Sequence, residues 1–143
     1  MFIGEYIHTI DVKKRLAIPS KFRKELGKKA IITKGLDNCL VLYPQKEWAK
    51  IAEKLGSLPT TQTEARSFAR MMLAGAMEVR LDNLGRILIP DYLKEYAFLK
   101  KEVAVIGLFN RIEIWSLENW KEYKKKAEVS AQDIAERLKE LGI

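Results

Sequence analysis

The chain has 143 residues, of which 48% are hydrophobic and 31% charged, a composition that allows one compact domain with a core and excludes a disordered tail. Its formal net charge of +7 suits a polyanionic partner without identifying one. The single cysteine, Cys39, excludes an intrachain disulfide framework and fits a reducing setting.

Most of the excess positive charge is concentrated near the start of the chain. Residues 1–34 hold nine basic and three acidic residues, a net charge of +6, whereas the remaining residues together carry +1. A solvated protein face shows the same pattern, so charge alone leaves nucleic acid as one option. No apolar run approaches the roughly 20 residues of a membrane span, and the first residues lack the basic region of a secretory signal. We therefore expect a cytoplasmic protein that has no membrane partner.

One short motif occurs twice in the chain. The stretch IDVKKRLAIP at residues 10–19 returns in altered form as LDNLGRILIP at residues 81–90. After a small insertion in the second copy, Gly35 aligns with Gly107, and the residues around them match as well. Matches in this order indicate an internal duplication.

Each copy predicts the same series of elements. A strand enters a tight hairpin loop, and a second strand leaves it and is stopped by proline. A short helix follows, which Ser20 or Asp91 can cap, and then two apolar strands around a bend at Gly35 or Gly107 and a closing helix. The matching segments lie at residues 5–10 and 77–81, 15–18 and 86–89, 20–26 and 91–97, 30–43 and 102–115, and 45–55 and 117–127.

A half of about fifty residues buries too little surface to be comfortable alone, so we expect the two halves to pack around a pseudo-twofold axis. The predicted class is α+β. The predicted boundaries are a first half at 1–57, a connecting loop and helix at 58–77, a second half at 78–127 and an amphipathic C-terminal helix at 128–143. That last helix either docks on a partner or packs on its own domain.

The duplicated motif places an aspartate four residues before an arginine in each copy, Asp11 with Arg15 and Asp82 with Arg86. A carboxylate can accept paired hydrogen bonds from a guanidinium group and orient it. For a single copy, a structural ion pair that holds a turn is the plainer interpretation. However, a surface ion pair contributes only roughly 0–1 kcal/mol, so stability gives little reason to keep the geometry twice.

A pseudo-dyad would let both loops project from one side as a two-pronged basic surface. Arginine can read guanine in the major groove, asparagine can read adenine, and lysine suits phosphates. Lys21, Arg23 and Lys24 on the first short helix can equally form a solvated helix face. The predicted DNA-binding residues are Arg15, Arg86, Lys13, Lys14 and Asn83, oriented by Asp11 and Asp82, with auxiliary phosphate contacts from Lys21, Arg23, Lys24 and Arg80.

Nothing in the sequence indicates an enzyme. His8 is the only histidine and alternates with apolar residues, and no metal-ligand spacing, Ser/His/Asp set, Walker loop or GxGxxG is present. Neighbouring cations would keep both Asp11 and Asp82 ionised, whereas acid–base catalysis by a carboxylate pair needs two clearly different pKa values. We therefore expect no catalytic residue, no metal, no cofactor and no small-molecule substrate.

Three stretches, MFIGEYIHTIDVKKRLAIPSKFR, LDNLGRILIPDYLKEYA and VIGLFNRIEIWSLENWKEY, resemble the MraZ family of bacterial transcriptional regulators over nearly the whole chain. The resemblance implies two AbrB-like (SpoVT-AbrB) split β-α-β halves, packed as one compact β-barrel-like unit with peripheral helices. It also implies ring-shaped homo-oligomers. They would bind short direct repeats in the promoter of the division and cell wall gene cluster, which includes the regulator's own gene, through the DxxxR loops.

The resemblance has one exception. The family usually has glycine before the first arginine, where this chain has Lys14, while Gly85 keeps the pattern in the second loop. If that position needs a positive φ, Lys14 is strained. The sequence thus predicts a cytoplasmic, nucleoid-associated, sequence-specific regulator that binds double-stranded DNA. The alternative is a protein-binding module, antitoxin-like or scaffold, with the same fold.

Overall fold

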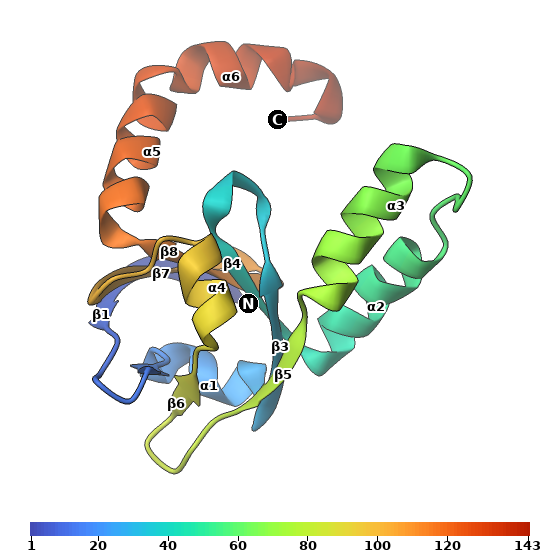
Figure 1. Cartoon of the computed structure of the whole chain (residues 1–143). Coiled ribbons are helices and arrows are strands. Elements are labelled where there is room, and N and C mark those ends of the chain that lie inside the picture. The colour runs from blue at the N-terminus through green and yellow to red at the C-terminus, as the bar shows by residue number, and fades with distance from the viewer.

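The computed structural model describes all 143 residues, which form a six-stranded antiparallel sheet, a two-stranded ribbon and flanking helices (Figure 1). The elements in chain order are β1 (Phe2–Thr9), β2 (Arg15–Ala17), α1 (Ser20–Leu26), β3 (Lys29–Lys34), η1 (Leu36–Asn38), β4 (Leu40–Pro44), α2 (Gln45–Gly56), α3 (Thr63–Ala69), η2 (Arg70–Ala74), β5 (Met77–Arg80), β6 (Arg86–Leu88), α4 (Asp91–Tyr96), β7 (Glu102–Phe109), β8 (Arg111–Ser116), α5 (Leu117–Val129), α6 (Ala131–Arg137) and η3 (Lys139–Leu141).

The two halves of the chain exchange strands. The order in the large sheet is β1-β7-β8-β4-β3-β5, so β1 pairs with β7 of the second half and β5 pairs with β3 of the first. Strands β4 and β8 join the halves at the centre of the sheet, and β2 pairs with β6 in the separate ribbon. The order is unchanged when the halves are exchanged. The predicted α+β class with two pseudo-symmetric halves is therefore confirmed.

The core lies between the inner face of the sheet, the ribbon and the short helices α1 and α4. A cluster of 20 buried residues fills it, drawn from both halves. On the ribbon, Leu16 faces Ile87, and both are fully buried. Helix α2 covers the outer face through Trp48 on Tyr43, with ring centroids 5.7 Å apart. Because each half supplies part of every layer, the ribbon that carries both loops rests on a shared core.

The prediction that the two strands flanking each loop pair with each other as a hairpin is wrong. Strand β1 pairs with β7 and not with β2, and a single bridge between Ile10 and Leu16 joins the strands that flank the first loop. The predicted side-chain caps are also wrong. Pro19 and Pro90 hold the N-cap positions of α1 and α4, and neither Ser20 nor Asp91 makes a capping bond.

The bend predicted at Gly107 lies elsewhere. Gly107 is inside β7 opposite Gly4, where an added Cβ would come within 2.6 Å of the backbone nitrogen of Ile3. The chain turns instead at Phe109 and Asn110, between the paired strands β7 and β8. The glycine is needed here because the backbone of β1 comes close to it.

The pairing also corrects the alignment of the two copies. Val79 pairs with Ala30, and its counterpart His8 pairs with Val103. Ala30 of β3 therefore corresponds to Val103 of β7, whereas the sequence alignment would match it with Glu102. The reason is that the connection from α4 to β7 is longer than the connection from α1 to β3.

The helices that follow the two halves pack differently: α3 and η2 follow the first half, and α6 follows the second. The π-helical turn η2 packs on β3, where the Thr33 hydroxyl donates to the backbone carbonyl of Met72 at 2.7 Å. Helix α6, by contrast, lies apart from the sheet at the far end of α5 and is exposed along its length, including Ile134, and Leu138 just beyond it is exposed as well (Figure 1). None of the helices is long and apolar enough to cross a bilayer.

Candidate nucleic-acid interface

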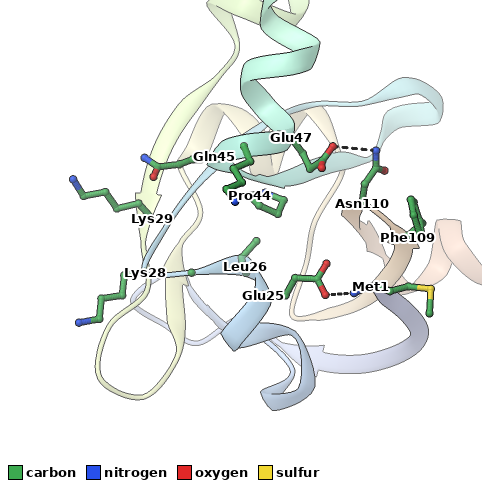
Figure 2. Close-up of a pocket in the computed structure, with 12 residues that line it drawn as sticks. Met1, Glu25, Leu26, Lys28, Lys29, Pro44, Gln45, Glu47, Phe109 and Asn110 are labelled. Carbon is green, nitrogen blue, oxygen red and sulfur yellow. Dashed lines mark hydrogen bonds and ion pairs between the residues drawn. The ribbon is translucent and has the colours of Figure 1, made fainter.

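A hollow with a volume of about 790 Å³ lies between the end of α1, the start of α2 and the β7–β8 turn (Figure 2). Its carboxylates are already paired: Glu25 binds the N-terminal ammonium group of Met1, and Glu47 accepts hydrogen bonds from Asn110 at 3.4 Å and from Lys50 at 3.1 Å. The lining contains no histidine, cysteine or serine. The hollow therefore offers no imidazole, thiol or hydroxyl group and no unpaired carboxylate.

The other reactive side chains are tied into the fold. His8 donates from Nδ1 to the backbone carbonyl of Ala17 at 2.7 Å, which holds β1 to the ribbon. Cys39 is fully buried, and this burial raises the pKa of its thiol. No group of three or more histidine, cysteine, aspartate or glutamate side chains is arranged to hold a metal ion.

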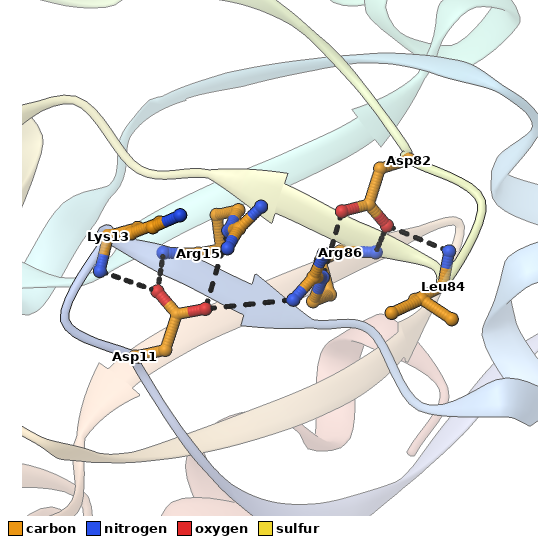
Figure 3. Close-up of polar contacts among 6 residues, drawn as sticks. All are labelled: Asp11, Lys13, Arg15, Asp82, Leu84 and Arg86. Carbon is orange, nitrogen blue, oxygen red and sulfur yellow. Dashed lines mark hydrogen bonds and ion pairs between the residues drawn. The ribbon is translucent and has the colours of Figure 1, made fainter.

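Each loop is built around one aspartate (Figure 3). In the first loop, Asp11 Oδ1 accepts from the backbone amides of Lys13 and Arg15 at 2.8 and 2.9 Å, and its Oδ2 accepts from Arg15 Nε at 3.3 Å. One carboxylate thus holds both the turn and the arginine that follows it.

The second loop repeats this arrangement. Asp82 Oδ1 accepts from the amides of Leu84 and Arg86, both at 2.9 Å, and its Oδ2 accepts from Arg86 Nε at 2.8 Å. The aspartate amide also donates to the arginine carbonyl at 2.9 Å, as it does in the first loop. In both loops the aspartate therefore accepts a hydrogen bond from the side chain of the arginine four residues later.

The residue before each arginine has a positive φ. Lys14 has φ +64° and Gly85 has φ +74°, and their amides donate to the carbonyls of Asp11 and Asp82 at 3.0 and 2.9 Å. Glycine adopts this conformation freely, whereas lysine is strained in it. Lys14 compensates with an ion pair between its Nζ and Asp91 Oδ2 at 2.7 Å.

Both loop aspartates titrate at unusually low pH. The hydrogen bond from the Arg15 amide, together with the nearby cation, holds the pKa of Asp11 below its usual range. The Arg86 amide has the same effect on the pKa of Asp82. Both carboxylates are therefore ionised at neutral pH and keep their arginines in place.

The ribbon brings the two loops together at one end of the molecule (Figure 1). Arg86 Nη1 lies 3.8 Å from Asp11 Oδ2, so Asp11 contacts both arginines (Figure 3). Two matching backbone bonds of 2.9 Å, from the Ile18 amide to Gly85 and from the Ile89 amide to Lys14, connect each loop to the opposite strand. The loops form one connected unit instead of two separate prongs.

The arginines keep hydrogen-bonding capacity for a ligand. Their side chains are 31% exposed in Arg15 and 27% exposed in Arg86. The Nη atoms of Arg15 have no hydrogen-bond partner in the chain. These free donors lie at the end of the ribbon, where a ligand can reach them.

The other predicted site residues surround this pair. Lys13 and Asn83 are exposed at the loop tips, Lys21 and Lys24 are exposed on α1, and Arg80 is exposed at the end of β5. Arg23 differs, since it is half-buried and its Nε donates to the carbonyl of Ile18 at 2.8 Å. It lies directly over Gly85, so part of its role is to cover the second loop.

Four further residues lie at this surface and were not predicted. Val12 is 99% exposed at the first tip, and Leu84 is 62% exposed at the second. Lys28 and Lys29 lie beside the second loop because β3 pairs with β5, and Lys29 is directly opposite Arg80. Charge near residue 30 was visible in the sequence, but its place beside the loop depends on strand pairing.

Comparison with known proteins agrees with the duplicated architecture. The family model described as "MraZ protein, putative antitoxin-like" matches the chain twice, at residues 1–71 and 72–141. A protein of Caldicellulosiruptor saccharolyticus named transcriptional regulator MraZ is 55% identical over 143 residues, which is the whole of both chains. Proteins of the same name from Alkaliphilus metalliredigens and Caldanaerobacter subterraneus are each 53% identical over the same full length. The chain therefore belongs to the MraZ family, a family of transcriptional regulators and not of enzymes.

Proposed function

We propose that this regulator binds DNA sequence-specifically by placing loops 11–15 and 82–86 in the major groove. The observation that carries the proposal is the pair of aspartate-oriented arginines on one ribbon, linked through Asp11. A guanidinium group held in place loses little side-chain entropy when it binds, so its hydrogen bonds contribute more to affinity. Bidentate donation to guanine O6 and N7 is the commonest specific contact that arginine makes with DNA.

The remaining loop residues have roles that match their exposure. Asn83 would read adenine, and Lys13 and Lys14 would contact phosphates, since all three lie at exposed positions of the loops. Lys21, Lys24 and Arg80 would widen the phosphate contact, with a smaller share for the half-buried Arg23. These outer cations would add affinity rather than sequence preference.

The target we propose is a set of short direct repeats in the promoter of the division and cell wall gene cluster, which includes the regulator's own gene. A ring-shaped homo-oligomer in the cytoplasm, associated with the nucleoid, would place one subunit on each repeat, about one helical turn of roughly 10 base pairs apart. Weak contacts would then add through effective concentration, and the DNA or the ring would have to bend. The exposed apolar residues on and just after α6 support association between copies.

The proposal is tested by replacing the two arginines. Arg15→Ala and Arg86→Ala should each cost about 1–3 kcal/mol of binding to the duplex upstream of the protein's own coding sequence, and should relax base preference. Lys125→Ala on α5 is the control, because it removes an exposed cation that lies outside the two loops. Unchanged promoter binding by the Arg15→Ala, Arg86→Ala double variant, with a folded protein in thermal unfolding, would refute the proposal.

A second candidate is a protein-binding module in which the basic loops meet an acidic protein. The family description includes the word antitoxin-like, which favours keeping this candidate. Recovery of a stoichiometric protein partner in a pull-down, with no DNA shift at low salt, would support it. A DNA shift that depends on Arg15 and Arg86 would decide against it.

A further inference from the structure

The charges beside the two loops do not follow the pseudo-symmetry of the backbone. Six cations lie on the elements beside the loop at 82–86, which are helix α1, the start of β3 and the end of β5. We call this set the basic flank; it consists of Lys21, Arg23, Lys24, Lys28, Lys29 and Arg80. The equivalent elements beside the loop at 11–15 are helix α4 and the chain from Lys101 into β7, and they carry two cations and three carboxylates. We call this set the mixed flank; it consists of Asp91, Lys94, Glu95, Lys101 and Glu102.

The basic flank is attached to the second loop through α1 and the start of β3. Arg23 covers Gly85, and a shallow hollow between α1 and the loop is lined by Lys24 and Lys28 together with Asn83. The carbonyl of Lys28 accepts from the Leu81 amide at 2.9 Å, which attaches the start of β3 to the loop. None of the six cations forms an ion pair within the chain, so their charges are available to a ligand.

The mixed flank has the same position relative to the first loop. Asp91 binds Lys14 of that loop, and the carbonyl of Lys101 accepts from the Ile10 amide at 2.8 Å. Glu102 is directly opposite Thr9 at the end of β1. This pair is the counterpart of Lys29 opposite Arg80, where both residues are basic.

Side chains at equivalent positions of the two flanks therefore carry opposite charges. The duplicated motif matches α1 with α4, which places Glu95 where Lys24 stands in the first copy. The strand pairing matches β3 with β7, which places Glu102 where Lys29 stands. The basic flank carries +6 and the mixed flank −1, and the sums become +5 and 0 when Glu25 of α1 and Lys100 are included. A phosphate backbone would therefore be attracted to the basic flank and not to the mixed flank.

We propose that each subunit binds duplex DNA in one fixed orientation, with the phosphate backbone continuing from the 82–86 loop across the basic flank and away from the mixed flank. This inference rests on the proposed function. The two loops are nearly equivalent by backbone, so with symmetric flanks only the residues that differ at the loop tips, such as Asn83, would distinguish the two directions on the duplex. The flanks remove this equivalence, because each lysine–phosphate contact releases a counterion on one side only.

The test reverses charges at matched positions. Variant one is Lys24→Glu with Lys29→Glu, and variant two adds Glu95→Lys and Glu102→Lys, which restores the net charge. The control, Arg70→Glu with Lys125→Glu, makes the same change in net charge as variant one at exposed positions of η2 and α5. All are compared with the wild type on the duplex upstream of the protein's own coding sequence, trimmed to the segment that one subunit protects, and on a random duplex of equal length.

Two readouts measure the effect. The salt dependence of binding should flatten by roughly 1.8 in log–log slope in variant one, since two phosphate contacts are lost, and should be unchanged in the control. Phosphate ethylation interference should lie on one side of the bases read by the loops in the wild type. In variant one, where the basic flank still carries +2, that interference should weaken on the same side, and in variant two, where the flanks carry +2 and +3, it should appear on both sides.

The outcomes separate the inference from the function it rests on. Wild-type interference that is symmetric about the protected bases, or interference that stays confined to the same side in variant two, would overturn fixed orientation while leaving DNA binding intact. A wild-type protein that binds neither duplex would overturn the proposed function, and the orientation with it.

Discussion

The loops at 11–15 and 82–86 share one hydrogen-bond framework and complete it differently. In the first, the position before the arginine is Lys14, which is stabilised by Asp91 at 2.7 Å. In the second it is Gly85, which is covered by Arg23, and an added Cβ there would come within 2.2 Å of Arg23 Nε. The positive φ is thus accompanied by an ion pair in the first loop and by glycine in the second. Only the glycine leaves room for Arg23 to lie over the loop.

The largest effect in this comparison is expected from Gly85→Ala. The new Cβ would be strained at φ +74° and would push against the half-buried Arg23, so the free energy of unfolding should fall by about 1–3 kcal/mol. Urea unfolding measures this loss. Lys14→Ala is the matched control at the first loop, where a Cβ is already present. Equal losses in the two variants would show that Arg23 does not restrict the second loop.

The next effect concerns the two aspartates. Asp11 contacts both arginines, whereas Asp82 contacts only its own. Asp11→Asn should therefore weaken DNA binding more than Asp82→Asn, because it loosens both guanidinium groups. Binding titrations on one duplex compare the two. A larger loss from Asp82→Asn would show that the contact between Asp11 and Arg86 does not matter for binding.

A smaller effect is expected from pH. The pKa values of Asp11, Asp82 and Asp91 are lowered in the folded protein, so their contribution to stability is present above the unfolded value of about 3.9 and is lost as pH falls through the folded values. Stability should therefore change little through these groups between pH 8 and 5 and should decline below about pH 4. Denaturant unfolding at several pH values, with the Asp11→Asn, Asp82→Asn double variant as reference, measures this. An acid decline of the same size in that variant would contradict the assignment to the loops.

The smallest effect is expected from Lys14→Gly. Glycine relieves the strain at φ +64° but removes the ion pair with Asp91 and adds backbone freedom to the unfolded chain, so the net change in the free energy of unfolding should be within about 1 kcal/mol. The sharper measurement is a double-mutant cycle with Asp91→Ala. Additive changes would show that the ion pair does not stabilise the first loop.

The predicted parts of the site are the local ones. The duplicated motif and the aspartate that binds the arginine four residues later follow from spacing within a few residues. The positive φ before the arginine is indicated only by the glycine that the family usually has at that position. The contact between Asp11 and Arg86 could not be predicted, since it joins residues from different copies. The position of Lys29 beside the second loop depends likewise on the pairing of β3 with β5.

The sequence by itself determined that the chain is duplicated, that each copy carries an Asp–Arg loop, and that the fold is α+β, because these features depend on local residue patterns and their repetition. Only the tertiary structure decided that the halves exchange β1 and β5, that Gly107 lies inside a strand and that Arg23 covers Gly85. These features depend on which strands pair at long range and in which register. A half of about fifty residues buries too little surface to stabilise one strand pairing by itself, so the pairing is stabilised by the core that both halves share.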